Sequence, residues 1–320
     1  MKKIWLLIGI IIVAAGLITW RFFSNPAPPE KITLINPLGP AAIPVAGISS
    51  NQVQGDVPLE VQFWKTPDEA VALLAADKAE FAVLPITEAA NIYAKDINIK
   101  MLGVHEWKVF YLAATGGVSF EGWDSLKGKK IYTPHGRGQT VDILIRSALS
   151  ERGIDPDRDL EILYASPQEI VSLFKAGKMD FAALPEPFAT LAIQGGSGSI
   201  VLDFQEYWGK TNNIPERLPV AGLFVKKEFF EKYPEITQDV SQVFAQSTDW
   251  SNENADQALE AAGEVLPIPE PVMKTALSRI DFYFVPINKC QEEVEFFLDK
   301  MHELYPQGIS QLPDEDFYSR

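Results

Sequence analysis

A glycine-rich segment at residues 135–140 combines residue types that could bind an anion. It follows a predicted strand and opens a predicted helix, so free backbone N–H groups and the positive end of the helix dipole point to one place. As a nucleotide fingerprint the segment is weak, because the third glycine is absent. An ordinary capped turn is the alternative. The residues expected to contact a ligand are His135, Gly136, Arg137, Gly138, Gln139 and Thr140.

Two charged residues have the chemistry to hold the ends of a polar solute. The Arg137 guanidinium offers a planar fork of donors to a sulfonate, carboxylate or phosphate, or it is a solvated loop charge. Glu186 follows a predicted strand, where its carboxylate either contacts the ligand or complements a helix N-terminus. If both line one crevice, they could pair with each other or hold a zwitterion.

Glu186 lies in the second copy of an internal repeat. Residues 67–90 and 167–190 are identical at 11 of 24 aligned positions, which indicates a duplicated structural unit. Each copy predicts a helix, a turn and a short buried strand that ends at a proline. Because the carboxyl ends of parallel strands open onto a crevice, the two proline turns predict a cleft between two similar lobes.

Other segments are expected to line the same cleft. The loop after the first predicted strand supplies a contact from the first lobe, and Thr115 lies at the predicted hinge, where lobe closure changes backbone torsions. Trp208 could stack on a planar ligand, or pack in the core or at its rim. Besides the residues already named, the predicted contacts are Leu38, Gly39, Pro40, Pro85, Ile86, Thr87, Thr115, Pro185 and Trp208.

The order of predicted elements favours an α/β chain with two lobes, each a mostly parallel sheet flanked by helices. Residues 1–30 form an export signal or anchor with a proline-rich linker. A discontinuous lobe I comprises 31–115 and 222–320, and lobe II comprises 116–221. The strand at Val220 to Val225 is expected to return to the first lobe, which the later helices also join.

Several motifs, taken in order, resemble the substrate-binding proteins of ABC importers of the nitrate, taurine, alkanesulfonate and thiamine-precursor group. Together they cover most of residues 31–320; they are Leu126-Lys127-Gly128-Lys129-Lys130-Ile131, Ala183-Leu184-Pro185-Glu186-Pro187-Phe188-Ala189, Val225-Lys226-Lys227-Glu228-Phe229, Arg279-Ile280-Asp281-Phe282 and Leu312-Pro313-Asp314-Glu315-Asp316-Phe317-Tyr318. The resemblance implies a type II periplasmic-binding-protein fold with the ligand cleft between its lobes. It also implies that Glu186 holds a ligand amine or hydroxyl. The tail departs from the family pattern at Ile309-Ser310-Gln311, where relatives commonly carry Gly-Gly-Lys.

Composition excludes some other classes of protein. The chain has 28 Lys and Arg against 43 Asp and Glu, a net charge of -15 without the basic stripe that nucleic acids require. Its three histidines show no metal-ligand spacing, and no cofactor, catalytic residue or bound metal is expected. Cys290 is the only cysteine in the sequence, and we expect it to be a small buried side chain rather than a reactive thiol.

The amino terminus predicts export. Ile4 to Trp20 is an uncharged apolar run after Lys2 and Lys3, either a cleaved signal or, slightly favoured, a retained anchor. Leu17 stands where a lipoprotein needs its lipidated cysteine, which excludes that tether. We therefore expect the folded body in the periplasm or at the outer face of the cytoplasmic membrane.

These observations favour a monomeric, non-catalytic receptor that captures a small polar organic or anionic solute by lobe closure and delivers it to an ABC permease. One alternative is a membrane-tethered ligand sensor. Another is an enzyme on the same fold, of the thiamine-pyrimidine or menaquinone-pathway type, which the export segment disfavours. The identity of the solute does not follow from the fold.

Overall fold

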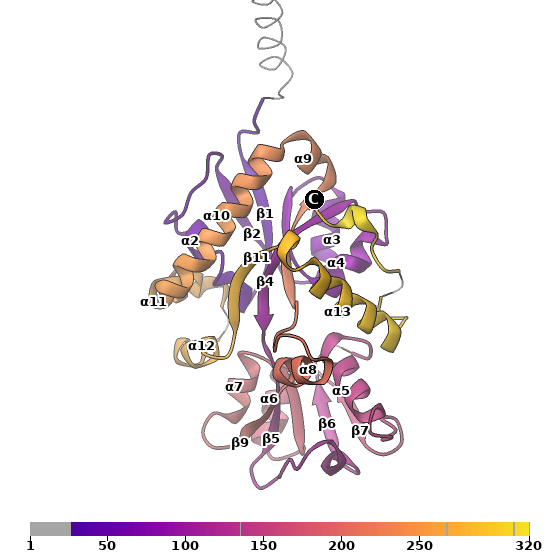
Figure 1. Ribbon diagram of the computed structural model, residues 1–320. Coiled ribbons are helices and arrows are strands. Elements are labelled where there is room, and N and C mark those ends of the chain that lie inside the picture. Colours follow the sequence, from indigo (N-terminus) through magenta and orange to yellow (C-terminus); the bar gives the residue numbers. More distant parts are fainter. Residues whose placement is uncertain (1–26, 135, 267, 310, 320) are drawn as a thin grey trace, which may run out of the picture.

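The computed structural model describes residues 27–134, 136–266, 268–309 and 311–319. Its strands form two separate sheets, one in each of the two lobes seen in Figure 1. The larger sheet has the order β11-β4-β10-β3-β1-β2, with bounds Asp281–Pro286, Ile99–Lys108, Ala221–Lys226, Phe81–Pro85, Ile32–Pro37 and Leu59–Trp64. The smaller sheet has the order β7-β6-β8-β5-β9, with bounds Glu161–Tyr164, Lys130–Thr133, Phe181–Pro185, Phe110–Thr115 and Gly198–Asp203.

Helices flank both sheets, as predicted. The larger lobe carries α2 (Ala46–Ser49), α3 (Pro67–Ala75), α4 (Ile86–Tyr93), α9 (Lys227–Lys232), α10 (Pro234–Glu253), α11 (Ala255–Ala262), α12 (Glu270–Leu277) and α13 (Gln291–Leu304). The smaller lobe carries α5 (Thr140–Ser150), α6 (Pro167–Lys175), α7 (Phe188–Ile193) and α8 (Phe204–Asn212). Short 3-10 turns are η1 (Pro40–Ala42), η2 (Trp123–Leu126), η3 (Gly263–Val265), η4 (Ile287–Lys289) and η5 (Glu315–Phe317).

The internal repeat has the predicted structure in both lobes. Each copy is a helix that leads into a buried strand, α3 into β3 and α6 into β8. A hydroxyl caps each helix, because Thr66 accepts from the Glu69 N–H and Ser166 from the Glu169 N–H, with proline at the first helical turn. The two units therefore place their terminal prolines, Pro85 and Pro185, at equivalent positions.

Both sheets are mixed rather than mostly parallel. In the larger sheet β1 runs parallel to β2 and β3, whereas β10 is antiparallel to β3 and β4. In the smaller sheet β6 runs parallel to β7 and β8, whereas β5 is antiparallel to β8 and β9. Strands β5 and β10 arrive from the other lobe and are reversed, as is β11, which is antiparallel to β4. Both β5 and β10 enter a sheet at its carboxyl edge and must run against its parallel strands.

The strand pairing moves one predicted boundary. Lobe I was expected to include residues up to 115, but β5 pairs with β8 and β9, so the chain leaves the larger sheet after Lys108. The return of Val220 to Val225 to the first lobe is confirmed, since β10 pairs with β3 and β4. The division into folding units is otherwise a prediction.

The predicted export segment lies outside the described residues. Among the helices that the structure describes, none is both long enough and apolar enough to cross a bilayer.

Candidate functional site

The carboxyl edges of the two sheets face each other across the lobe junction. Strand β4 ends at Lys108 and β5 begins at Phe110, which pairs with Pro185 at the carboxyl end of β8. A second crossover returns beside the first, because the Leu218 N–H donates to the Trp107 carbonyl at 2.9 Å and the Val220 N–H donates to the Glu106 carbonyl at 2.9 Å. Two adjacent backbone segments, residues 107–110 and 218–220, thus connect the lobes.

A buried glutamine holds the first crossover. Gln205, at the start of α8, accepts from the N–H groups of Val109 and Phe110 at 3.3 and 2.9 Å, and its amide donates to the Phe110 carbonyl at 2.9 Å. These bonds satisfy backbone groups where the chain changes from one sheet to the other. Residues 107–110 and 218–220 are therefore the two segments at which the chain passes between the lobes.

The predicted hinge at Thr115 is wrong. Thr115 pairs with Gly198 and its hydroxyl donates to the Met179 carbonyl at 2.7 Å, before β8 begins. The register pairs Phe110 with Pro185 and Ala114 with Phe181, so Thr115 lies at the end of β5 away from the junction. Strand length, about 3.3 Å per residue, separates it from the facing edges.

Both proline turns of the repeat lie at the junction. The Ile86 N–H donates to the Val220 carbonyl at 3.0 Å, and the Glu186 N–H donates to the Val109 carbonyl at 2.8 Å. Each turn thus contacts one crossover segment. Pro85 and Thr87 are half-buried and the Ile86 side chain is fully buried.

The loop after β1 has free space beside it that another group could occupy. Leu38 is exposed and Pro40 half-buried, and Gly39 has φ of 106° with no heavy atom within 4 Å of the position a Cβ would occupy. Asn36 anchors this loop by donating to the carbonyls of Pro37 and Ala41 at 2.9 and 3.0 Å. The predicted first-lobe loop is therefore held in place with free space beside it.

The glycine-rich loop has a hydrogen-bond acceptor within its own lobe. The Gly138 N–H donates to the Asp142 carboxylate at 2.8 Å, and Asp142 is buried and also accepts from Arg146 at 2.9 Å and from the Tyr164 hydroxyl at 2.7 Å. A carboxylate of the chain itself thus occupies the place where the helix dipole favours an anion.

The remaining residues of that loop also have partners or face water. Arg137 makes a two-bond fork to Asp157 at 3.1 and 2.9 Å, with both side chains half exposed. Gln139 is the N-cap of α5 without a side-chain bond, while Gly136 and Thr140 are half-buried. His135 lies outside the described residues.

Glu186 joins the two lobes instead of pairing with Arg137. Its carboxylate is buried and accepts from the Thr190 N–H and hydroxyl, both at 2.9 Å. Arg279, which follows α12 in the larger lobe, donates to the Thr190 hydroxyl at 2.8 Å and lies 3.5 Å from the Glu186 carboxylate. Burial raises the pKa of Glu186, opposed by the Thr190 bonds and by the Arg279 charge.

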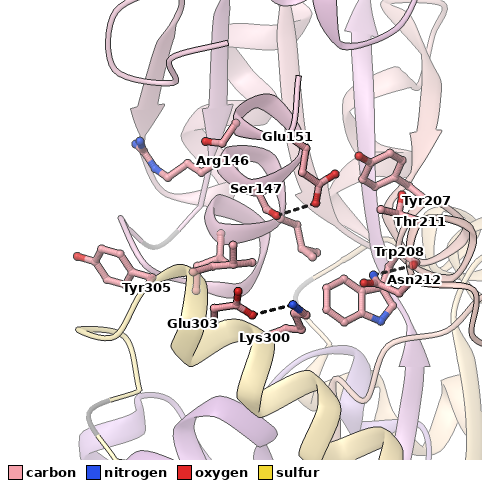
Figure 2. Close-up of a pocket in the computed structure, with 14 residues that line it drawn as sticks. Arg146, Ser147, Glu151, Tyr207, Trp208, Thr211, Asn212, Lys300, Glu303 and Tyr305 are labelled. Atoms are coloured by element: carbon pink, nitrogen blue, oxygen red, sulfur yellow. Dashed lines mark hydrogen bonds and ion pairs between the residues drawn. The ribbon is translucent and has the colours of Figure 1, made fainter. Parts of the chain in front are cut away.

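Trp208 packs between the lobes. It is almost fully buried, and its ring centroid lies 5.7 Å from that of Phe296 and 6.0 Å from that of Phe297, both on α13. Beside it α5, α8 and α13 enclose a cavity of about 300 Å³. Figure 2 shows that its polar side chains pair with one another, Ser147 with Glu151 and Lys300 with Glu303.

Sequence reasoning missed two charged residues near the end of β4. Lys108 pairs with Asp203 of the smaller lobe at 2.6 Å. Glu106 is 9% exposed, and burial raises the pKa of its carboxyl to about 7. The sequence feature that could have identified Glu106 is a glutamate inside a strand that is otherwise buried and largely apolar. No group of three His, Cys, Asp or Glu in the described part of the chain could hold a metal ion.

The chain is similar to known binding proteins. Residues 124–265 match the NMT1-like family. A Bacillus subtilis protein named "Putative binding protein YtlA" is 24% identical over 220 residues, which cover 66% of this chain and 63% of that protein. A "Putative aliphatic sulfonates-binding protein" from the same organism is 24% identical over 72% of this chain and 65% of its own length. The aligned regions thus span slightly under two thirds of these relatives.

Solved structures share the fold over nearly the whole chain. An ABC transporter protein from Parabacteroides distasonis has a TM-score of 0.75 at 25% identity, covering 91% of this chain and 99% of that one. The periplasmic aliphatic sulphonate binding protein SsuA from Escherichia coli has a TM-score of 0.71 at 15% identity, covering 91% and 96%. The predicted two-lobed fold and the resemblance to substrate-binding proteins of ABC importers are confirmed.

Proposed function

We propose that this chain is the solute-binding component of an ABC importer, which captures a small polar solute between its lobes and presents the closed form to a permease. The observation that carries the proposal is the pair of adjacent crossovers at residues 107–110 and 218–220. They leave the facing sheet edges free to approach or separate by a few torsion changes.

The surroundings of the crossovers support closure as the working motion. Turns from both lobes contact these segments, so a solute bound beside them would touch both lobes. The names of the relatives refer to binding proteins, which favours a non-catalytic role. The predicted ligand contacts of this chain are part of the proposal.

The predicted location and partners complete the proposal. The apolar run at residues 4–20 would export the chain and, if retained, tether it near the permease. We expect the folded body to act as a monomer at the outer face of the membrane or in the periplasm. Its acidic net charge disfavours nucleic acid as a partner.

Thermal unfolding of the full chain in mild detergent, screened against sulfonates, oxyanions, amino acids, amines and pyrimidines, tests this function. A ligand at a hundred times its Kd should stabilise the folded form by about 2.7 kcal/mol. Spin labels at Glu151 and Glu303, on helices that face each other across the cavity in Figure 2, should then report a shorter distance. Stabilisation without any change in distance, or turnover of the hit seen by mass spectrometry, contradicts the proposal.

A further inference from the structure

Glu106 lies in the last row of the larger sheet before the lobe junction. Its backbone is paired with Ala221 on β10 and with Phe282 on β11, and Ala221 is paired with Pro85. The pairing of β4 with both neighbours is irregular at this row, with register shifts beside Ala221 and on both sides of Phe282. Glu106 thus lies in one row with Phe282 and with the proline turn after β3.

The side chains around this row pack against the lobe junction, beside which the solute is proposed to bind. Phe282 packs in one cluster with Ala42 and Ile43 of the loop after β1, with Val109 of the crossover and with half-buried Phe110. The Glu106 carbonyl also accepts the N–H of Val220 in the second crossover. Glu106 is therefore placed where the first-lobe loop and both connections between the lobes come together.

The carboxyl of Glu106 has no partner within the described chain. It is nine-tenths buried, yet it makes no hydrogen bond or ion pair with any residue that the structure describes. Burying a carboxylate without a compensating group is unfavourable, and burial accordingly raises the pKa of this carboxyl to about 7. A buried carboxylate without a partner is stabilised by any hydrogen-bond donor that reaches it.

The cations around the junction are already neutralised. Lys108 pairs with Asp203 at 2.6 Å and Arg279 lies 3.5 Å from Glu186, while Arg137 is held by Asp157. In the glycine-rich loop the Gly138 N–H donates to Asp142. An anionic solute would have to displace one of these partners, whereas a solute with a donor would find Glu106 unpaired.

We propose that Glu106 is the residue that recognises the solute, and that the solute carries a cationic or N–H-donating nitrogen that bonds to this carboxylate. This inference rests on the proposed receptor function and narrows its ligand class. It contrasts with the sulfonate named for one relative and with the anion site predicted from residues 135–140. A charge-assisted hydrogen bond in a desolvated site is among the strongest that a receptor can offer.

Matched pairs of probes test the inference on the full chain. Thermal unfolding at pH 7.5 compares butylamine with butanesulfonate and benzylamine with benzenesulfonate, each at up to 20 mM, with nitrate alongside. We expect the amines to raise the Tm and the anions to leave it unchanged. Calorimetric titration with the best amine should show binding weakened about 10- to 100-fold in Glu106→Gln, the range for loss of a hydrogen bond to a charged group.

The control variant is Asp281→Asn. Asp281 is exposed and lies opposite Lys108 in the sheet register. Its replacement by asparagine removes the same charge from the same edge of the sheet without altering a buried group. It should bind the amine as the parent does. Equal weakening in both variants would mean that only the general negative potential matters, which overturns a specific role for Glu106.

Other outcomes separate this inference from the receptor function. Tm shifts by a sulfonate or nitrate that persist in Glu106→Gln overturn the cationic ligand class and leave solute binding intact. Failure of every amine to shift the Tm also overturns it, because an unpaired carboxylate that contacts the solute must favour a cation. Loss of the receptor function itself would instead appear as unchanged lobe distances with every bound solute.

Discussion

Charged residues at the lobe junction differ in whether the chain itself supplies their partners. Arg137, the most conspicuous cation in the sequence, is held by Asp157, and Glu186 is held by Thr190 and Arg279. Glu106 lacks such a partner among the described residues and carries the cost of its burial. A residue that is unfavourable for folding and lies beside a cleft is better explained by binding than by stability.

The free-energy cost of burying Glu106 makes the stability of the unliganded protein depend on pH. The pKa of Glu106 is about 7 in the folded chain and 4.5 as the ordinary value, so between these pH values the folded state holds a proton that the unfolded state releases. Stability conferred by this proton is complete below pH 4.5 and lost as the pH rises through 7. Glu106→Gln lacks the titration and should exceed the parent by about 3 kcal/mol at pH 8.

Urea unfolding of both proteins from pH 5 to pH 8 measures this difference. The difference between the two free energies of unfolding should shrink towards pH 5, where Glu106 of the folded chain is protonated and resembles glutamine. A constant difference across this range would show that the carboxyl does not titrate in this window, and that its burial is compensated by a group we have not assigned.

The duplicated helix and strand units are the best predicted elements, because their signals are local. A hydroxyl cap, a proline at the first turn, an apolar stripe and a terminal proline each act within a few residues. The two copies consequently fold alike, although they lie in different lobes and against different neighbours.

The caps predict a specific loss of stability. Ser166→Ala removes the acceptor for the Glu169 N–H at 3.3 Å and should lower the free energy of unfolding by about 1 kcal/mol. Ser172→Ala in the same helix is the matched control, since the Ser172 hydroxyl only donates to the Gln168 carbonyl one turn earlier. Urea denaturation monitored by circular dichroism distinguishes them. Equal losses would mean that the two serine hydroxyl bonds contribute alike and that the cap has no special part.

Elements whose place depends on distant partners could not be predicted from local pattern. β5 is an apolar strand that would fit either sheet, and only its pairing with β8 and β9 places it in the smaller one. Arg137 pairs with Asp157, 20 residues away on a loop, and the cation beside Glu186 is Arg279, 93 residues away after α12. Sequence therefore identified the cleft-forming turns but not which of their charges remain free.

Across the whole molecule, the lobes contact each other on two sides of the crossovers. On one side the carboxyl-terminal tail meets the glycine-rich loop, where a Cβ on Gly138 would lie 2.1 Å from the Tyr305 ring. On the other side α12 meets α7 through Arg279, and Figure 1 shows these two helices facing each other across the junction.

The tail contact predicts that Gly138→Ala loosens the lobes. Gly138 has φ of 88°, so alanine is strained there, and its methyl group must displace Tyr305. We expect a loss of about 1 to 3 kcal/mol in the free energy of unfolding. Gly136→Ala is the control, because no heavy atom lies within 4 Å of its Cβ position. If both variants lose the same stability, the Tyr305 contact has no special part.

The Arg279 contact predicts a shift towards open lobes when it is removed. Arg279→Gln withdraws the cation from buried Glu186, and the Tyr111 hydroxyl bond to the Arg279 carbonyl at 2.6 Å remains because it uses the backbone. With Arg279 about one third exposed, the pair contributes only about 1 kcal/mol, enough to change the open population several-fold rather than to unfold the chain.

Spin labels at exposed Glu270 and Gln194, on the two sides of this contact, measure the distance between α12 and α7. Cys290 can stay in place, because it is buried and desolvation raises the pKa of its thiol to about 12. The distance distribution should broaden and lengthen in Arg279→Gln and in Glu186→Gln, and the double variant should add little to either. Additive lengthening would mean that the two side chains act on the lobes separately, and that their ion pair is not what holds this side of the junction closed.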